Sequence, residues 1–368
     1  MVQRKNKDTN KWEFDVSNGV DPITKKRIRK VITGFATKKE ARKAEEEFIA
    51  LNFNKGISSK NVTLDIIYLI MTKIDVEKEK KESYIKTQEY NYNKHFKEYF
   101  KEATISKLTK TDMLTFRSFL LNKGLSKSTV NKQMVLLRKL MSVAVEKHYI
   151  PTNPCHSIKK LKYKTEKMSF WTGEEFQQFI SLFQEDEEPY KLIFRVAFST
   201  GMRIGEILAL TWKDIDFPDE TIHVTKTLTR GNHFKTNTPK TSSSEREISI
   251  QKPLIRSLQE WKTKQQQLLA PYYDNTEDLQ IFQFVPSHIN YENVRRQYDN
   301  ILRRDSTLKR IRIHDFRHSH AAYLIHIEEK EIVIMERLGH STINITYDIY
   351  GHLYPSKQKE LASKMEAF

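Results

Sequence analysis

Phenols and imidazoles are crowded near the end of the chain, in the stretch LGHSTINITYDIYGHLY at residues 338–354. This stretch holds three tyrosines and two histidines: Tyr347, Tyr350, Tyr354, His340 and His352. A phenol has a pKa of about 10, so it is a poor nucleophile until cationic neighbours or a base assist it. Tyr347 and Tyr350 are three residues apart and would share one face of a helix. Periodicity alone therefore does not choose between them.

Three further motifs supply charged side chains. TGMRIGEI contains Arg203 and Glu206, TPKTSSSEREI contains Lys240, and HDFRHSH contains His314 and Arg317. Arginine is planar, always charged and able to bind two oxygens at once, so two arginines suit a phosphate group. Each motif is weak by itself, because HxxR occurs often by chance and an arginine near a helix start is usually structural. The order and spacing of the motifs together are the signal.

This set of motifs resembles the tyrosine recombinase family, the phage-integrase type of site-specific DNA recombinase. TGMRIGEILAL matches the first arginine box, HDFRHSHAAYLI matches the second, and LGHSTINITYDIYGHL matches the nucleophile box. The resemblance covers the whole chain in outline and is specific in roughly the last 200 residues. All six catalytic motif positions are filled there: Arg203, Lys240, His314, Arg317, His340 and Tyr350.

The resemblance implies that a tyrosine oxygen attacks a DNA phosphodiester, leaving a 3′-phosphotyrosyl link and a free 5′-hydroxyl. The bond energy stays in that link, so no nucleotide cofactor is expected, and the arginines substitute for a metal ion. The implied nucleophile is Tyr350, ten residues past His340. Tyr347 takes a place that the family usually gives to an apolar residue, so we expect it to be packed.

The remaining residues receive their roles from the same resemblance. Arg203 and Arg317 bind the non-bridging phosphate oxygens, and Lys240 protonates the leaving 5′-oxygen. His314 handles the proton at the tyrosine, and His340 hydrogen-bonds the phosphate. Glu206 supports the site.

Several other interpretations stay open. Lys235, in the same loop, is a rival to Lys240. Three histidines, His314, His318 and His320, have a spacing that zinc could use, although Arg317 among them would repel a cation. Ser242–Ser244 lack the GxSxG context of a serine nucleophile, so they are better explained as a hairpin tip.

The elements expected to hold these residues form three domains in a mainly α fold with small β-sheets, of class α+β. Residues 1–57 should form a basic sheet, with strands at 11–16 and 25–32 and a turn at Asn18-Gly19, followed by a helix at 37–50 capped by Thr37 and Glu40. Counting residues 1–60 gives 15 basic against 8 acidic side chains. This domain resembles the arm-binding domain of larger integrases.

Residues 62–150 are predicted to be all helical and resemble the core-binding (SAM-like) domain. The last of four helices is expected to be capped by Ser126 or Ser128 and to bury a stripe of Met134, Leu137, Met141 and Ala144. Residues 151–167, with two prolines and a basic run, are expected to be a linker, and residues 168–368 the catalytic domain. A short helix is expected at 354–368. Candidate DNA contacts are exposed cations on the first two domains: Lys25, Arg27, Arg29, Lys127, Lys132, Arg138 and Lys139.

Composition agrees with a DNA partner. The chain has 368 residues and a net charge of +16, which suggests a polyanion. It has no apolar run long enough to span a membrane, no secretory signal, and one cysteine, Cys155, so a cytoplasmic location in a bacterial cell is expected. The resemblance further implies a homotetramer on two double-stranded attachment sites, with an excisionase and a DNA-bending protein as accessory partners.

The predicted function is integration and excision of a mobile element. One rival keeps the chemistry but resolves chromosome dimers or transposon cointegrates, although the basic N-terminal domain argues against it. Another rival is a non-catalytic DNA-binding regulator, which the six competent motif residues oppose. A third is a relaxing enzyme of the type IB topoisomerase kind, which would act without paired sites.

Overall fold

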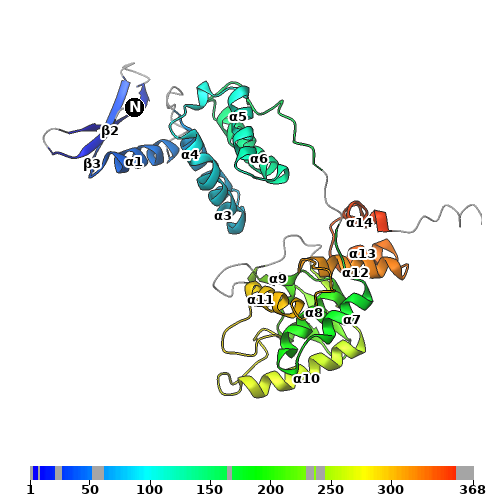
Figure 1. Ribbon diagram of the computed structural model, residues 1–368. Helices are drawn as coiled ribbons and strands as arrows, with labels where there is room; N and C mark the ends of the chain where they lie inside the picture. The colour runs from blue at the N-terminus through cyan, green and yellow to red at the C-terminus, as the bar shows by residue number, and fades with distance from the viewer. Residues whose placement is uncertain are drawn as a thin grey trace, which may run out of the picture. The chain divides into compact units, whose positions relative to one another are not determined.

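The fold was obtained as a computed structural model (Figure 1). It describes residues 3–6, 9–20, 27–51, 62–163, 168–228, 236–237 and 245–353, with only the backbone described at 16–20, 27–30, 46–51, 237 and 352. The chain divides into two compact units, Met1–Thr165 and Glu166–Phe368. No helix in the described ranges is long and apolar enough to cross a membrane.

The first unit begins with an antiparallel sheet in the order β1-β2-β3 (Arg4–Lys5, Trp12–Val20, Arg27–Phe35). Helix α1 (Lys38–Leu51) packs on it through Ala41 against Phe14, and the Thr37 hydroxyl accepts from the Glu40 N–H as expected. The expected turn at Asn18-Gly19 is wrong, because both residues lie within β2. The ladder instead shifts its register between Ser17 and Val20.

The rest of this unit is helical and has its own apolar core. Ser126 caps α6, and the predicted stripe of Met134, Leu137, Met141 and Ala144 is buried. A π-helical turn, η3, lies between α3 and α4, and the sequence pattern did not indicate it. The elements are α2 (Leu64–Glu77), α3 (Glu82–Asn91), η3 (Tyr92–Phe96), α4 (Lys97–Phe100), η4 (Ile105–Lys107), α5 (Lys110–Asn122) and α6 (Lys127–Glu146).

Much of the segment expected to be a linker packs against α6. Cys155 and Ile158 are buried in the helical core. Asn131 binds the backbone of Leu161 through both its amide nitrogen and its amide oxygen. The connection between the two units is therefore shorter than residues 151–167.

Two of the predicted DNA contacts on α6 hold this arrangement together. Arg138 donates to the carbonyls of Cys155 and Ile158, and Lys139 forms an ion pair with the buried Asp75. We expected both on the outer surface, but they are half-buried because these carbonyls and this carboxylate need partners. Lys127 and Lys132 are exposed, as expected.

The second unit combines helices with a small antiparallel sheet in the order β4-β5-β8 (Ile215–Asp216, Thr221–Val224, Arg246–Ser249). After β5 the chain continues into β6 (Thr227–Leu228), which pairs with β7 (Thr236–Asn237). The helices and helical turns are α7 (Gly173–Ser181), η5 (Glu185–Glu187), α8 (Glu188–Thr200), α9 (Ile204–Ile207), η6 (Trp212–Asp214), α10 (Lys252–Leu269), α11 (Tyr291–Leu302), α12 (Asp315–His326), α13 (Glu331–Leu338), α14 (Ile343–Tyr350) and η8 (Gly351–Leu353).

Two apolar cores stabilise this unit. The larger contains an aromatic cluster in which Trp171, Phe179 and Phe316 meet. The smaller joins α12, α13 and α14 through Ala321, Leu338 and Tyr350. A tyrosine of the opening motif is thus part of a core. The expected helix at 354–368 lies outside the described residues.

Candidate active site

The turn after α8 brings three helices together. Gly201 ends α8 with a φ of +65°, a left-handed conformation that glycine adopts without strain. A Cβ at Gly201 would lie 2.6 Å from the His320 ring of α12 and 2.7 Å from the Leu338 side chain of α13. The turn therefore needs glycine both for its conformation and for this close approach. It leads directly to Arg203.

Arg203 lies at the N-terminus of α9 and is tied to Glu206 one turn later. Its backbone N–H donates to Glu206 Oε2 at 3.0 Å, and its guanidinium donates to Oε1 at 2.7 Å. The Arg203 side chain remains 40% exposed, whereas that of Glu206 is 3% exposed. The exposed part of the Arg203 guanidinium can therefore contact a ligand, while Glu206 holds the side chain and backbone of Arg203 in position.

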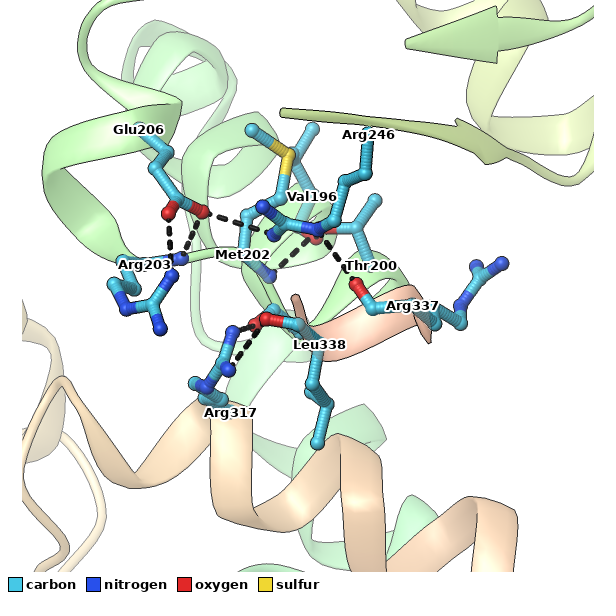
Figure 2. A network of polar contacts seen from close by, with 10 residues as sticks. Val196, Thr200, Met202, Arg203, Glu206, Arg246, Arg317, Arg337 and Leu338 are labelled. Carbon is cyan, nitrogen blue, oxygen red and sulfur yellow. Dashed lines mark hydrogen bonds and ion pairs between the residues drawn. The ribbon is translucent and has the colours of Figure 1, made fainter. Parts of the chain in front are cut away.

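A further arginine completes this network, as Figure 2 shows. Arg246, at the start of β8, donates from Nη2 to Glu206 Oε2 at 2.9 Å and from Nε to the carbonyl of Arg337 at 2.8 Å. Burial would raise the pKa of Glu206, but the charges and hydrogen bonds of Arg246 and Arg203 lower it below its usual value. Glu206 is therefore a carboxylate. Arg246 links it to the end of α13.

Arg317 of α12 is buried, and its guanidinium donates to two backbone carbonyls. Nη1 reaches the Gly201 oxygen at 2.8 Å, and Nη2 reaches the Leu338 oxygen at 2.5 Å (Figure 2). Burial, followed by the charge of Arg203, lowers the pKa of Arg317 to about 9. The side chain remains cationic at neutral pH. It lies where the α8 turn and the α13 C-terminus meet.

Tyr350 is fully buried, and its hydroxyl oxygen lies 2.8 Å from Nδ1 of His318. Burial raises the pKa of Tyr350 to about 12, although the charge of Arg317 acts in the opposite direction. His318 itself has its pKa lowered to about 4, mainly by burial and then by His314. From the sequence, His318 was considered only as a possible zinc ligand. Its contact with the phenol depends on how α12 and α14 pack, which no local motif reports.

The two predicted catalytic histidines take different positions. His314 lies at the N-cap position of α12 without forming a side-chain cap hydrogen bond, it is exposed, and its ring centre lies 5.4 Å from that of His318. His340 follows the α13 C-terminus and is buried, with Nδ1 2.9 Å from the Thr346 hydroxyl. Burial and the charge of Arg317 lower the pKa of His340 to about 4. Its ring stacks near that of Tyr350, with ring centres 6.5 Å apart.

Tyr347 does not pack as expected, because its side chain is 46% exposed. On α14 the buried positions are Thr346 and Tyr350, four residues apart and on one face. Tyr347 is turned about 100° from Thr346, towards the edge of that face. The structure thus distinguishes the two tyrosines that periodicity could not separate.

Lys240, Lys235 and the serines 242–244 lie outside the described residues, as does Lys25, and the side chains of Arg27 and Arg29 are not described either. The zinc alternative meets a specific obstacle. Nδ1 of His320 lies 2.7 Å from the Phe198 carbonyl oxygen, and its Nε2 accepts from Arg337 Nε at 3.1 Å. Both ring nitrogens are therefore engaged within the protein. No group of three or more metal-ligating side chains occurs in the described part of the chain.

Three family models match successive segments of the chain. Residues 2–50 match an arm DNA-binding domain, residues 65–164 a phage integrase SAM-like domain, and residues 169–357 the phage integrase family. The ICEBs1 integrase of Bacillus subtilis (strain 168) is 42% identical over 363 residues, 96% of each chain. A tyrosine recombinase XerC-like protein of Caldanaerobacter subterraneus subsp. tengcongensis is 29% identical and covers 91% of this chain and 90% of its own length.

Solved structures show the same fold. The Tn1549 transposon integrase in complex with a circular intermediate DNA has a TM-score of 0.70 at 20% identity, covering 83% of this chain and 99% of its own. A lambda integrase tetramer bound to a Holliday junction has a TM-score of 0.60 at 16% identity, and the match covers 92% of this chain and 95% of the lambda integrase chain. The family model over the catalytic unit and the 42% identical relative over almost the whole length agree with the motifs, so the chain belongs to the phage integrase family of tyrosine recombinases.

Proposed function

We propose that this chain integrates and excises a mobile element by cutting and rejoining DNA through a covalent 3′-phosphotyrosyl intermediate. The observation that carries the proposal is the site around Tyr350: a single buried phenol, hydrogen-bonded to an imidazole and subject to the charges of Arg317 and Arg203. Family membership supplies the reaction class. The relative with 42% identity is itself an integrase.

Each arginine suits a particular part of this reaction. Negative charge develops on the non-bridging oxygens as phosphorus becomes five-coordinate, and Arg203 and Arg317 would stabilise it. Arg203 has an exposed guanidinium for this purpose, and Glu206 keeps it directed. Removing one such preorganised donor typically costs about 10²–10³ in rate. Lys240 would protonate the leaving 5′-oxygen, and His314 and His340 would act at the tyrosine and the phosphate.

The buried phenol must become accessible before it can attack. The Tyr350 side chain is 0% exposed, inside the small core formed with α12 and α13. When DNA binds at the arginines, the side chains that cover the Tyr350 hydroxyl would have to move aside so that a phosphate can reach it. Such a step would restrain cleavage until the DNA site is occupied.

The remaining assignments extend the same proposal. Residues 1–57 would bind arm sites, 62–150 the core site, and 168–368 would carry the chemistry on double-stranded attachment DNA. Among the predicted DNA contacts, Lys127 and Lys132 have described side chains that are exposed on α6. They are the candidates for contacts with the phosphate backbone of DNA. The working assembly would be a homotetramer in the bacterial cytoplasm, assisted by an excisionase and a DNA-bending protein.

A covalent-trapping experiment tests the reaction and the nucleophile together. The full chain would be incubated without magnesium with nicked suicide DNA carrying its attachment site, and covalent complex measured on a denaturing gel. We expect a covalent band with the wild type and Tyr347→Phe, and none with Tyr350→Phe. Loss only in Tyr347→Phe would reassign the nucleophile. No band with the wild type on DNA that it binds would overturn the proposed function.

A further inference from the structure

The imidazole that contacts the candidate nucleophile is not the one that the family motif singles out. His318 Nδ1 lies 2.8 Å from the Tyr350 oxygen, and the two ring centres are 5.6 Å apart. The exposed ring of His314 contacts His318 instead. A group that takes the phenolic proton must lie within hydrogen-bond reach of it, so geometry favours His318.

We propose that His318 accepts the proton of Tyr350 during strand cleavage, with Asp315 keeping the imidazole in the receptive tautomer. This inference rests on the proposed function, because it assigns a further catalytic residue to that same reaction. It transfers the proton-accepting role at the tyrosine from His314, to which the family motif assigns it, to His318, and leaves His314 in a supporting place beside the base.

The side chains around His318 favour a free lone pair on Nδ1. Its other nitrogen, Nε2, lies 3.9 Å from Asp315 Oδ1. A carboxylate on that side favours the tautomer with the proton on Nε2, which leaves Nδ1 to accept from the phenol. Asp315 is fixed in turn by Arg312, whose backbone N–H and guanidinium both donate to it. Asp315 therefore acts on the imidazole through its charge at 3.9 Å, whereas the contact between His318 and the phenol is within hydrogen-bond distance.

The proposed step is balanced in atoms and electrons. A bond forms between the Tyr350 oxygen and phosphorus as the bond from phosphorus to the 5′-oxygen breaks. The phenolic proton moves to His318 Nδ1, giving an imidazolium, while the leaving 5′-oxygen takes a proton from the general acid, for which Lys240 is the candidate. In the rejoining direction the imidazolium returns its proton to the departing phenolate.

Electrostatics supports this direction of transfer once DNA is bound. Burial and the cations around His318 keep its pKa low in the free protein, so it is neutral and able to accept a proton at pH 7. A DNA phosphate would offset those positive charges and raise the basicity of the imidazole. The titratable and charged groups facing it are His314, Asp315, Arg312, Arg317, His340 and Tyr350.

The decisive variant is His318→Asn in the full chain. The asparagine oxygen can occupy the place of Nδ1 and keep the hydrogen bond to the phenol, but it cannot take the proton. We expect the rate of covalent-complex formation to fall about 10²-fold or more, the range of a lost general base. His326→Asn, an exposed histidine on the same helix, is the matched control and should cleave at the wild-type rate. Thermal unfolding of both variants separates a folding defect from a catalytic one.

Two further readouts distinguish a base from a residue that merely holds the tyrosine. DNA with a bridging sulfur at the scissile 5′-position needs no proton on its leaving group, so it should restore cleavage by Lys240→Ala but not by His318→Asn. Cleavage by His318→Asn should also rise about tenfold per pH unit between roughly pH 7 and 9, because hydroxide must then take the phenolic proton.

The outcomes separate the two proposals. If the wild type forms no covalent complex, the proposed function fails first. If the wild type cleaves and His318→Asn keeps within about threefold of its rate, while His314→Asn does not, then His314 is the base and this inference is overturned. Rescue of His318→Asn by the bridging sulfur would place His318 on the leaving group and would overturn it equally.

Discussion

At the scale of single residues, the arginines of the site are arranged around the buried carboxylate of Glu206. Glu206 accepts from Arg203 and Arg246, and Arg246 reaches on to the carbonyl beside Leu338, whose own oxygen accepts from Arg317. Two guanidinium groups proposed to bind phosphate are thus connected through Glu206 and Arg246. Glu206 and Arg246 can therefore set the positions of Arg203 and Arg317 without touching the DNA themselves.

The charge on Glu206 makes a prediction about stability and pH. Glu206→Gln leaves the buried Arg246 without its counter-charge, so we expect it to lower the free energy of unfolding at pH 7 by about 3–5 kcal/mol. The pKa of Glu206 is lower in the folded protein than its usual value, so its contribution is complete above the unfolded pKa of about 4.3 and is lost as the pH falls through the folded pKa.

The measurement is chemical denaturation of the wild type and Glu206→Gln at several pH values. The difference between them should be constant above about pH 5 and should narrow below about pH 4. Glu174→Gln, at an exposed position on α7, is the control and should follow the wild type throughout. A difference that widens towards acid pH would contradict the lowered pKa.

Single residues also show how far sequence reasoning could go. The motifs singled out Arg203, Arg317 and His340 as site residues, because each is defined by its immediate neighbours in the chain. They did not predict the contacts of His318 and Arg246, whose partners are 32 and 40 residues away. Such contacts are produced by packing between elements, and no local pattern records them.

At the scale of elements, the helix termini were predictable because their signals are local. The capping residues Thr37 and Ser126 accept from the backbone N–H groups of Glu40 and Thr129, as their sequence context predicted. Short elements such as α9 were not predicted, since four residues are too few for a periodic signal. The burial of Tyr347 was wrongly predicted for a related reason: α14 is eight residues long and buries a narrow face.

Gly201 is the element-scale feature with the sharpest consequence. Gly201→Ala should destabilise the second unit by about 1–2 kcal/mol for the left-handed backbone and about 1–3 kcal/mol more for the clash with His320 and Leu338. Because the same turn carries Arg203 and a carbonyl that accepts from Arg317, covalent-complex formation should also decrease. Thermal unfolding and the trapping assay measure the two effects.

Gly124 provides a matched control for that substitution. It also has a positive φ, +78°, but a Cβ there would meet nothing within 4 Å. Gly124→Ala should therefore cost only the backbone strain of about 1–2 kcal/mol, with the catalytic unit unaffected. Equal destabilisation by the two substitutions would show that the close approach at Gly201 contributes nothing.

At the scale of the whole molecule, charge and chemistry are divided between the two units. Residues 1–165 carry 36 basic and 18 acidic side chains, a net charge of +18. Residues 166–368 carry 27 basic and 29 acidic side chains, a net charge of −2. The net charge of +16 that suggested a polyanion partner therefore belongs to the first unit, whereas the candidate catalytic residues belong to the second.

This division predicts which unit controls the salt dependence of DNA binding. Each phosphate neutralised by a cation contributes about −0.9 to the slope of log affinity against log salt concentration. Because each unit has its own apolar core, we expect residues 1–165 and 166–368 to unfold cooperatively when expressed separately. The first unit should retain most of the full-length slope on duplex DNA, and the second should bind weakly with a shallow slope.

Circular dichroism melting establishes that each unit folds, and fluorescence anisotropy at several salt concentrations then gives the slopes. Lys127→Gln/Lys132→Gln in the full chain tests the same idea without truncation. Loss of two exposed cations on α6 should reduce the slope by up to about 2 in magnitude, while the free energy of unfolding changes little. A steep dependence of affinity on salt for residues 166–368 alone would contradict this prediction. It would mean that local cations such as Arg203 and Arg317, and not the net charge of the first unit, dominate the attraction to DNA.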